Sequence, residues 1–111
     1  MAALLVIVAG PYSAPTAEDR AANLGAMHRA AAEVARRGHL PVIGVDAALP
    51  VLEALGRPYT DPLMMEISLA VAARCDGCLQ IGRSHGADRE ADAIRALGRP
   101  VWTRLEDLPP A

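Results

Sequence analysis

A short run of branched apolar residues near the start of the chain, Leu4 to Ala9, restricts the fold more than any other feature. The run is too short to span a bilayer, and no basic residue precedes it, so it lacks the pattern of a signal peptide. Gly10 and Pro11 end it abruptly. A continuous apolar run bounded by turn residues is typical of a strand buried on both faces. We therefore predict a central strand of a parallel sheet.

Helical and strand patterns alternate along the rest of the chain. Thr16 and Asp19 match a capping box and predict a helix that extends to about Arg37, where Gly38 stops it. Its inward face is expected to carry Ala21, Leu24, His28, Ala31 and Ala35. The further elements that we predict are a strand at 40–45, a short helix at 51–55 within an irregular segment 46–62, a helix at 63–74, a strand at 77–81, a helix at 87–97 and a strand at 100–103.

This order of elements indicates the fold class. Strands that alternate with helices across short turns form right-handed βαβ units, which build a parallel sheet covered on both faces. The 111 residues, 52% of them apolar, fit one α/β domain that spans 1–111. Ligands of such sheets bind at the carboxyl ends of the strands, where the strand order reverses. We therefore expect the site in the loops after the first and third strands.

Charge and composition exclude several functions. A net charge of −2 gives no reason to expect nucleic-acid or membrane binding. All 11 basic residues are arginines. The absence of lysine excludes Schiff-base catalysis, the phosphate-binding lysine of a P-loop and the lysine of phosphoacceptor receiver domains.

Two cysteines, Cys75 and Cys78, form a C-x-x-C pattern. A redox pair of this kind needs its first sulfur at a helix N-terminus, whereas Cys75 lies at the end of a predicted helix and Cys78 in a strand. Two cysteines without a nearby histidine do not make a zinc site. We expect two reduced, partly buried thiols, no metal, no cofactor and a cytoplasmic protein.

Glu90 is the candidate catalytic residue. Helical spacing places it on the inward face with Ala91 and Ile94, and neither of the positions three and four residues further on offers an ion pair. A carboxylate in a first helical turn suits the helix dipole, but Asp88 and Asp92 serve that purpose from more exposed positions. A carboxylate that faces inward is costly unless it has a task.

The segment that precedes Glu90 predicts an anion site. Ser84 and Gly86 lie where a helix N-terminus exposes free backbone N–H groups, although Ser84 also fits a plain helix cap. Asp88 joins them in the predicted binding set. His85, beside this loop, is the histidine we keep as a possible proton shuttle. We expect His28 to be packed in its helix and His39 to cap helix carbonyls.

The loop after the first strand completes the predicted site. Gly10 allows close backbone approach, Tyr12 offers a ring face and Ser13 a hydroxyl. Arg20 lies in the first helical turn, where a cation opposes the helix dipole. A bound phosphate or carboxylate would resolve that conflict; a surface pair with a neighbouring acid is the alternative.

Several motifs together resemble the nucleoside 2-deoxyribosyltransferase-like superfamily, most closely its small bacterial branch. They are V-I-V-A-G-P-Y at the start, R-G-H-L-P at the second strand, C-D-G-C-L-Q-I followed by S-x-G-A-x-x-E, and A-L-G-R-P-V near the end. They cover nearly the whole chain in order and spacing. The resemblance implies a flavodoxin-like sheet and an assembly in which neighbouring subunits complete each other's sites.

The resemblance also implies a chemistry. The motif glutamate, here Glu90, attacks the anomeric carbon of a deoxyribosyl group and displaces the base, and transfer to another base or to water follows. This is the logic of a retaining glycosidase. Family transferases carry aspartate at the position of Ser84, whereas the hydrolases of 2-deoxynucleoside 5-monophosphates carry a serine that contacts phosphate. Ser84 thus points to a 5-phosphorylated ligand and to water as acceptor.

Two positions depart from the family. Members commonly have an aspartate eight residues before the one that is here Asp76, and this chain has Ser68 there. They also often have a tyrosine three residues before the first-loop glycine, where this chain has Ile7. The aspartate would normally bind the sugar or handle protons. The acids that could substitute for it are Asp46, Asp61 and Asp88.

Three functions therefore remain open. The first is an N-glycoside hydrolase or transferase that acts on a nucleotide-like substrate, such as a (deoxy)nucleoside 5-monophosphate, through Glu90. The second is a nucleotide-binding module that has lost the chemistry. The third is a flavodoxin-like domain of unrelated use, which the scarcity of aromatic residues for flavin binding disfavours. The alanine-rich helices leave flat apolar faces, so we expect a homodimer or higher homo-oligomer.

Overall fold

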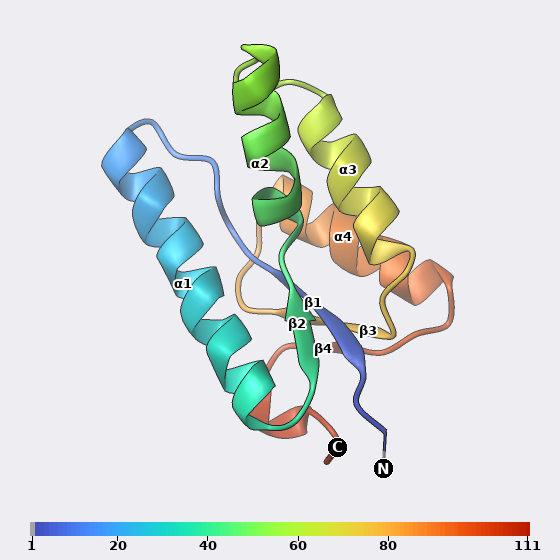
Figure 1. The fold of residues 1–111 in the computed structure, drawn as a ribbon. Helices are drawn as coiled ribbons and strands as arrows, with labels where there is room; N and C mark the ends of the chain where they lie inside the picture. Colours follow the sequence, from blue (N-terminus) through green and yellow to red (C-terminus); the bar gives the residue numbers. More distant parts are fainter. Residues whose placement is uncertain (1) are drawn as a thin grey trace.

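The computed structural model describes residues 2–111, which form one parallel sheet with helices on both of its faces (Figure 1). Its strands are β1 (Leu5–Ala9), β2 (Leu40–Val42), β3 (Gly77–Gln80) and β4 (Val101–Trp102). Its helices are α1 (Ala17–Arg36), α2 (Gly44–Leu55), α3 (Leu63–Ala72) and α4 (His85–Ala96), followed by the 3₁₀ turn η1 (Leu105–Asp107). No helix of residues 2–111 is long and apolar enough to cross a bilayer.

The strand order, β2-β1-β3-β4, is that of a flavodoxin-like three-layer sandwich. From β1 the chain first moves to β2 on one side and then crosses back to β3 on the other side. Residue Ile7 of β1 pairs with Val42 of β2 and with Cys78 of β3. The order therefore reverses between β1 and β3, where a sheet of this topology binds ligands.

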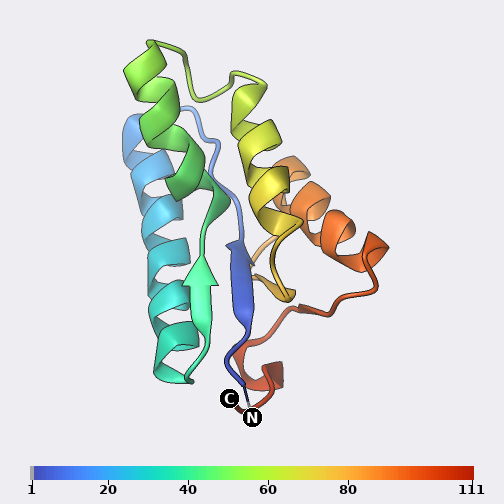
Figure 2. The same cartoon turned by 45° about the vertical axis from the view of Figure 1, so that its right-hand side comes forward.

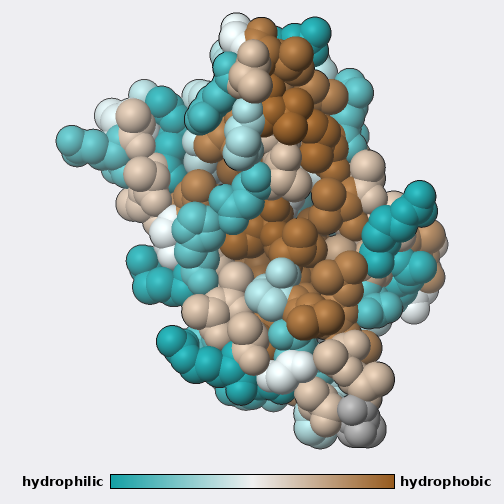
Figure 3. Space-filling view, in the orientation of Figure 1, coloured by the Kyte–Doolittle hydropathy of each residue, from teal (hydrophilic) through white to brown (hydrophobic). Residues whose placement is uncertain are grey.

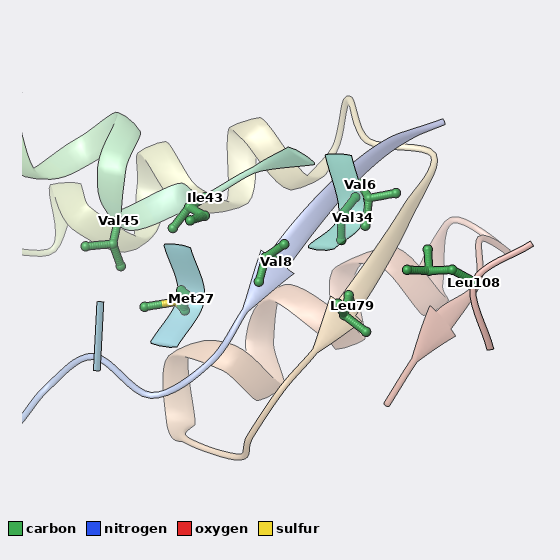
Figure 4. Packing of buried hydrophobic residues seen from close by; sticks show 8 residues of the cluster. All are labelled: Val6, Val8, Met27, Val34, Ile43, Val45, Leu79 and Leu108. Atoms are coloured by element: carbon green, nitrogen blue, oxygen red, sulfur yellow. The ribbon is translucent and has the colours of Figure 1, made fainter. Parts of the chain in front are cut away.

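The β1 strand is buried on both sides, as its sequence predicts. Val6 and Val8 point into a cluster with Met27 and Val34 of α1 (Figure 4). Alternate β1 residues enter a second cluster built largely from α3 and α4. Figure 2 shows the same division, with α1 on one side of the sheet and α3 and α4 on the other. The two-residue period of a strand thus feeds two separate cores.

The buried face of α1 differs from the predicted one. Met27 and Val34 are its buried residues, whereas Ala21, His28 and Ala35 of the predicted stripe are exposed. The free energy gained by burial grows with apolar area. The helix is therefore rotated to bury its few large side chains, and a stripe made mostly of alanine gave little information about its orientation.

The predicted second strand, 40–45, was too long. The strand ends at Val42, and α2 begins at Gly44 and continues through Pro50 to Leu55. A proline inside a helix removes one hydrogen bond, but the burial of Val45, Ala48 and Leu52 on one face holds the helix together. The packing of these side chains outweighs the tendency of proline to end a helix. The segment 46–62, which was expected to be irregular, is therefore mostly helical.

His39 does not cap helix carbonyls with its ring. It is buried, and its Nδ1 accepts the backbone N–H of Leu4 at 3.0 Å. Because Nδ1 is an acceptor, the ring proton lies on Nε2, which donates to the carbonyl of Pro109 at 2.6 Å. His39 thus connects the two end segments of the chain, which lie close together in Figure 1.

We predict that His39→Ala destabilises the fold by about 2–4 kcal/mol, because it leaves the part-buried Leu4 N–H and Pro109 carbonyl without partners. Chemical denaturation measures the change. His28→Ala is the control, since His28 is exposed and pairs only with Asp46 at the surface; its cost should stay below about 1 kcal/mol. Equal losses in the two variants would contradict the proposed connection.

Candidate functional site

A cavity of about 380 Å³ opens at the carboxyl ends of β1 and β3. Four parts of the chain line it: the β1–α1 loop, Val45 at the start of α2, the segment from Tyr59 into α3, and the first turns of α4 with the preceding Ser84. The lining residues are Gly10, Tyr12, Ser13, Val45, Tyr59, Thr60, Asp61, Pro62, Met64, Met65, Ser68, Ser84, His85, Gly86, Ala87 and Glu90. Its volume is in the range typical of small-molecule sites.

Most of the predicted site residues meet in this cavity. They are Gly10, Tyr12, Ser13, Ser84, Gly86 and Glu90, with His85 beside them. A Cβ on Gly10 would lie 2.8 Å from Cγ1 of Ile81, so only glycine lets the ends of β1 and β3 pack this closely. The two loops that the sequence singled out therefore form one site.

Arg20 and Asp88 do not line the cavity. The Arg20 guanidinium lies 4.6 Å from the centroid of the Tyr59 ring and donates to the carbonyl of Ala14 at 2.8 Å. Arg20 thus supports the wall from behind. Asp88 turns toward a different groove, where it accepts from Gln80 at 2.8 Å and from Arg83.

Glu90 lies at the floor of the cavity and is only 6% exposed. Burial disfavours its charged form and raises its pKa from 4.5 to about 7. Its α4 neighbours Ala87, Ala91 and Ile94 are buried and apolar. The carboxyl group is therefore poised between its neutral and ionised forms near neutral pH, as a carboxyl with a chemical task can be.

The first residue of α2 packs directly against Glu90. A Cβ on Gly44 would lie 3.1 Å from Oε1 of Glu90 and 2.6 Å from Oγ of Ser68. Only a glycine leaves room for both side chains. Ser68 is itself 1% exposed, so this hydroxyl and the Glu90 carboxyl group form the polar floor of the cavity beside a helix N-terminus, which favours negative charge.

Ser84 caps α4, and its hydroxyl still has a proton to donate. Its Oγ accepts the backbone N–H of Ala87 at 3.0 Å, which leaves the hydroxyl hydrogen for a ligand. His85 and Gly86 form the first turn, whose N–H groups make a local positive field. Asp61 and Glu90 line the cavity, whereas no arginine among residues 2–111 does so.

Two tyrosines form an aromatic wall. The rings of Tyr12 and Tyr59 meet edge to face, with centroids 5.7 Å apart and planes at 84°. The Tyr59 hydroxyl donates to the carbonyl of Ala14 at 3.4 Å, the same oxygen that Arg20 binds. These contacts fix the ring orientation before any ligand arrives.

The sequence did not reveal the wall between α2 and α3. Tyr59 and Asp61 fall in the segment expected to be irregular, yet both line the cavity. The parallel arrangement of the strands could have revealed this wall. Because β2 is parallel to β1 and adjacent to it, the residues that follow β2 begin at the same edge of the sheet as the β1–α1 loop. Of the three acids that could substitute at Ser68, Asp61 alone lines the cavity, since Asp46 pairs with His28 in a separate groove.

The two cysteines are free and buried, as predicted. Burial, with a smaller contribution from nearby carboxylates that include Glu90, raises the pKa of Cys75 to about 11 and that of Cys78 to about 12. A thiol that stays protonated at neutral pH is a poor nucleophile and a poor metal ligand. The thiols thus contribute packing and leave the chemistry of this region to Glu90.

No family model and no curated protein matches this chain. The functional argument therefore depends on the geometry of the cavity and on the motifs in the sequence.

We predict that Glu90→Gln stabilises the protein at high pH. Between about pH 4.5 and 7 the native state retains a proton that the unfolded state has released, so wild-type stability falls as the pH rises through this window. The variant should gain up to about 3 kcal/mol near pH 8 and nothing near pH 4. Denaturation across this pH range measures the difference in the free energy of unfolding between the variant and the wild type. The exposed change Glu66→Gln is the control. A difference for Glu90→Gln that does not vary with pH would refute the unfavourable burial of charge.

Proposed function

We propose that this protein is an N-glycoside hydrolase or transferase that cleaves the bond between base and sugar in a nucleoside or a nucleoside 5-monophosphate. The observation that carries the proposal is the buried Glu90 carboxyl group, which lines a cavity at the switch point of the sheet. Two of the motifs that resemble the nucleoside 2-deoxyribosyltransferase-like superfamily, V-I-V-A-G-P-Y and S-x-G-A-x-x-E, contribute Gly10, Tyr12, Ser84, Gly86 and Glu90 to this cavity and support the same chemistry.

The proposed reaction has two steps. An ionised Glu90 oxygen forms a bond to the anomeric carbon while the bond from that carbon to the base nitrogen breaks, and the electron pair leaves with the base. The departing base takes up a proton. In the second step an oxygen of water, or a nitrogen of a second base, forms a bond to the anomeric carbon and gives its proton to the group that protonated the departing base. The bond from that carbon to Glu90 breaks, and its electron pair restores the Glu90 carboxylate.

His85 is the proposed proton donor to the departing base. It lines the same cavity, at the first residue of α4. An imidazole ring can both donate and accept a proton through its nitrogens. A positioned proton donor contributes about a hundredfold or more to such a reaction, so this assignment concerns the rate and leaves the identity of the nucleophile unchanged.

The start of α4 is the proposed site of the 5-phosphate. The Ser84 hydroxyl and the first-turn N–H groups are donors with the geometry of a helix N-terminus, which binds anions in many proteins. Within residues 2–111, no arginine lines this end of the cavity. The phosphate is accordingly a secondary feature of the proposal, whereas cleavage through Glu90 is its core.

A nucleotide-binding module without catalysis is the second candidate. One observation favours it: Ser68, which replaces the family's aspartate, is the polar side chain beside Glu90. A hydroxyl cannot supply the negative charge of the missing group. With a Glu90 pKa of about 7, only part of the protein would carry the ionised nucleophile at neutral pH.

We predict that the protein releases free base from one class of ribo- or deoxyribonucleosides or their 5-monophosphates, as measured by chromatography. Glu90→Gln should lower the rate by about a thousandfold or more because the nucleophile is lost. The wild-type rate should rise with pH through about 7, as Glu90 ionises. Glu66→Gln, an exposed change on α3, is the control and should leave the rate unchanged.

Release that persists in Glu90→Gln would refute the nucleophile assignment. No release from any compound would refute catalysis, and it would leave the binding module as the function supported by the cavity.

We further propose that the chain forms a homodimer through α2. Figure 3 shows hydrophobic side chains gathered over α2 and α3, and Val51 and Leu55 of α2 are 44% and 53% exposed. A continuous apolar surface of this kind is typical of an interface. Sedimentation velocity should find a dimer for the wild type and a monomer for Leu55→Arg. Leu97→Arg, at an equally exposed leucine after α4, is the control and should remain dimeric.

A further inference from the structure

Asp61 is held in a fixed position at the aromatic end of the cavity. Its Oδ1 accepts the backbone N–H of Leu63 at 2.9 Å, and Arg57 lies 4.0 Å from the same oxygen. Both contacts use Oδ1, which leaves Oδ2 to accept from a ligand. Its side chain is 23% exposed and lines the cavity, so it is accessible to a molecule bound there.

The position of Asp61 relative to the floor of the cavity fits a base placed between them. Ser68, which lies beside Glu90 in the floor, follows Asp61 by seven residues, most of them in α3. Two helical turns correspond to roughly 10 Å along the helix axis. A base whose sugar reaches Glu90 would thus extend along this wall with its outer edge toward Asp61.

The neighbouring tyrosines supply the surface on which such a base would stack. Tyr12 and Tyr59 line the cavity together with Asp61, and their rings are fixed by each other, by Arg20 and by the Ala14 carbonyl. Stacking on aromatic rings binds every base and does not distinguish one from another. Any selection must therefore come from a polar group at the edge of the base.

We propose that Tyr12, Tyr59 and Asp61 form a base subsite that selects cytosine or adenine over uracil or hypoxanthine. This inference rests on the proposed function for the orientation of the ligand. A carboxylate only accepts hydrogen bonds, and it pairs with the exocyclic amino group of a base. Uracil and hypoxanthine carry a carbonyl oxygen at the corresponding position, which would face the Asp61 oxygen without a shared proton. A polar group left unpaired in this way costs affinity.

The test compares matched ligands that differ only at this edge: deoxycytidine against deoxyuridine, and deoxyadenosine against deoxyinosine. Calorimetry on Glu90→Gln measures binding without turnover. In that background we expect at least one amino-bearing ligand to bind about tenfold or more tightly than its carbonyl partner. Tyr59→Leu should weaken both members of that pair about equally, by roughly tenfold, because stacking does not distinguish them.

Asp61→Asn is the decisive variant. Asparagine keeps an oxygen to accept the Leu63 N–H, so the start of α3 is preserved, but its amide can turn a donor toward a carbonyl base. The preference should fall below about threefold or reverse. Asp46→Asn makes the same chemical change outside the cavity and should leave the preference intact.

The outcomes separate this inference from the proposed function. Base release by the wild type without an amino preference would overturn the subsite and leave the catalytic proposal standing. A preference that Asp61→Asn abolishes, in a wild type that releases no base, would support the subsite and refute catalysis. Equal binding within both pairs, a preference that survives Asp61→Asn, or no binding of any of the four ligands would overturn the subsite.

Discussion

The burial of one carboxyl group, that of Glu90, is the constraint on which the arrangement of the site depends. It is enclosed by the apolar inner face of α4 and by the first residue of α2, which must be glycine for Ser68 and Glu90 to fit beside it. Burial raises its pKa to about 7, so the ionised form is destabilised in the folded protein. Apolar burial elsewhere offsets this cost, since Ala91 and Ile94 of the same helix belong to a fully buried cluster with Ile7. Natural proteins often retain such destabilising groups where function requires them.

The sequence predicted the elements whose signals are local. The apolar run of β1, the Thr16 cap of α1, whose Oγ accepts the Asp19 N–H at 3.1 Å, and the burial of Glu90 all follow from patterns within one turn or one strand. Gly38 likewise adopts a left-handed φ of 87° after α1, a conformation that glycine reaches without strain. Parallel order and the switch point then followed from the alternation of these elements, because crossover connections permit few arrangements.

The remaining part of the site could not be predicted because its contacts are between residues far apart in the chain. Arg20 fits a ligand-binding cation when its helix is considered alone, but its guanidinium lies against Tyr59, which the fold brings from the other side of α2. Asp88 fits the anion loop by position, but Gln80 at the end of β3 draws its carboxylate into another groove. Pro50 concealed the length of α2, and with it the wall that carries Asp61. In each case, tertiary packing determines which of two locally acceptable structures forms.

The charges that line the cavity favour the binding of a substrate phosphate at one place and disfavour it at another. Ser84 and the start of α4 favour an anion, yet the ionisable acids of the lining are Asp61 and Glu90, and no arginine among residues 2–111 lines the cavity to balance them. A phosphate bound close to Glu90 would raise its pKa further, because like charges disfavour ionisation, and would thereby weaken the nucleophile. A substrate phosphate is therefore compatible with catalysis only at the outer end of the cavity, where water screens its charge. A neutral nucleoside carries no such restriction, and it satisfies the aromatic wall, Asp61 and Glu90 together.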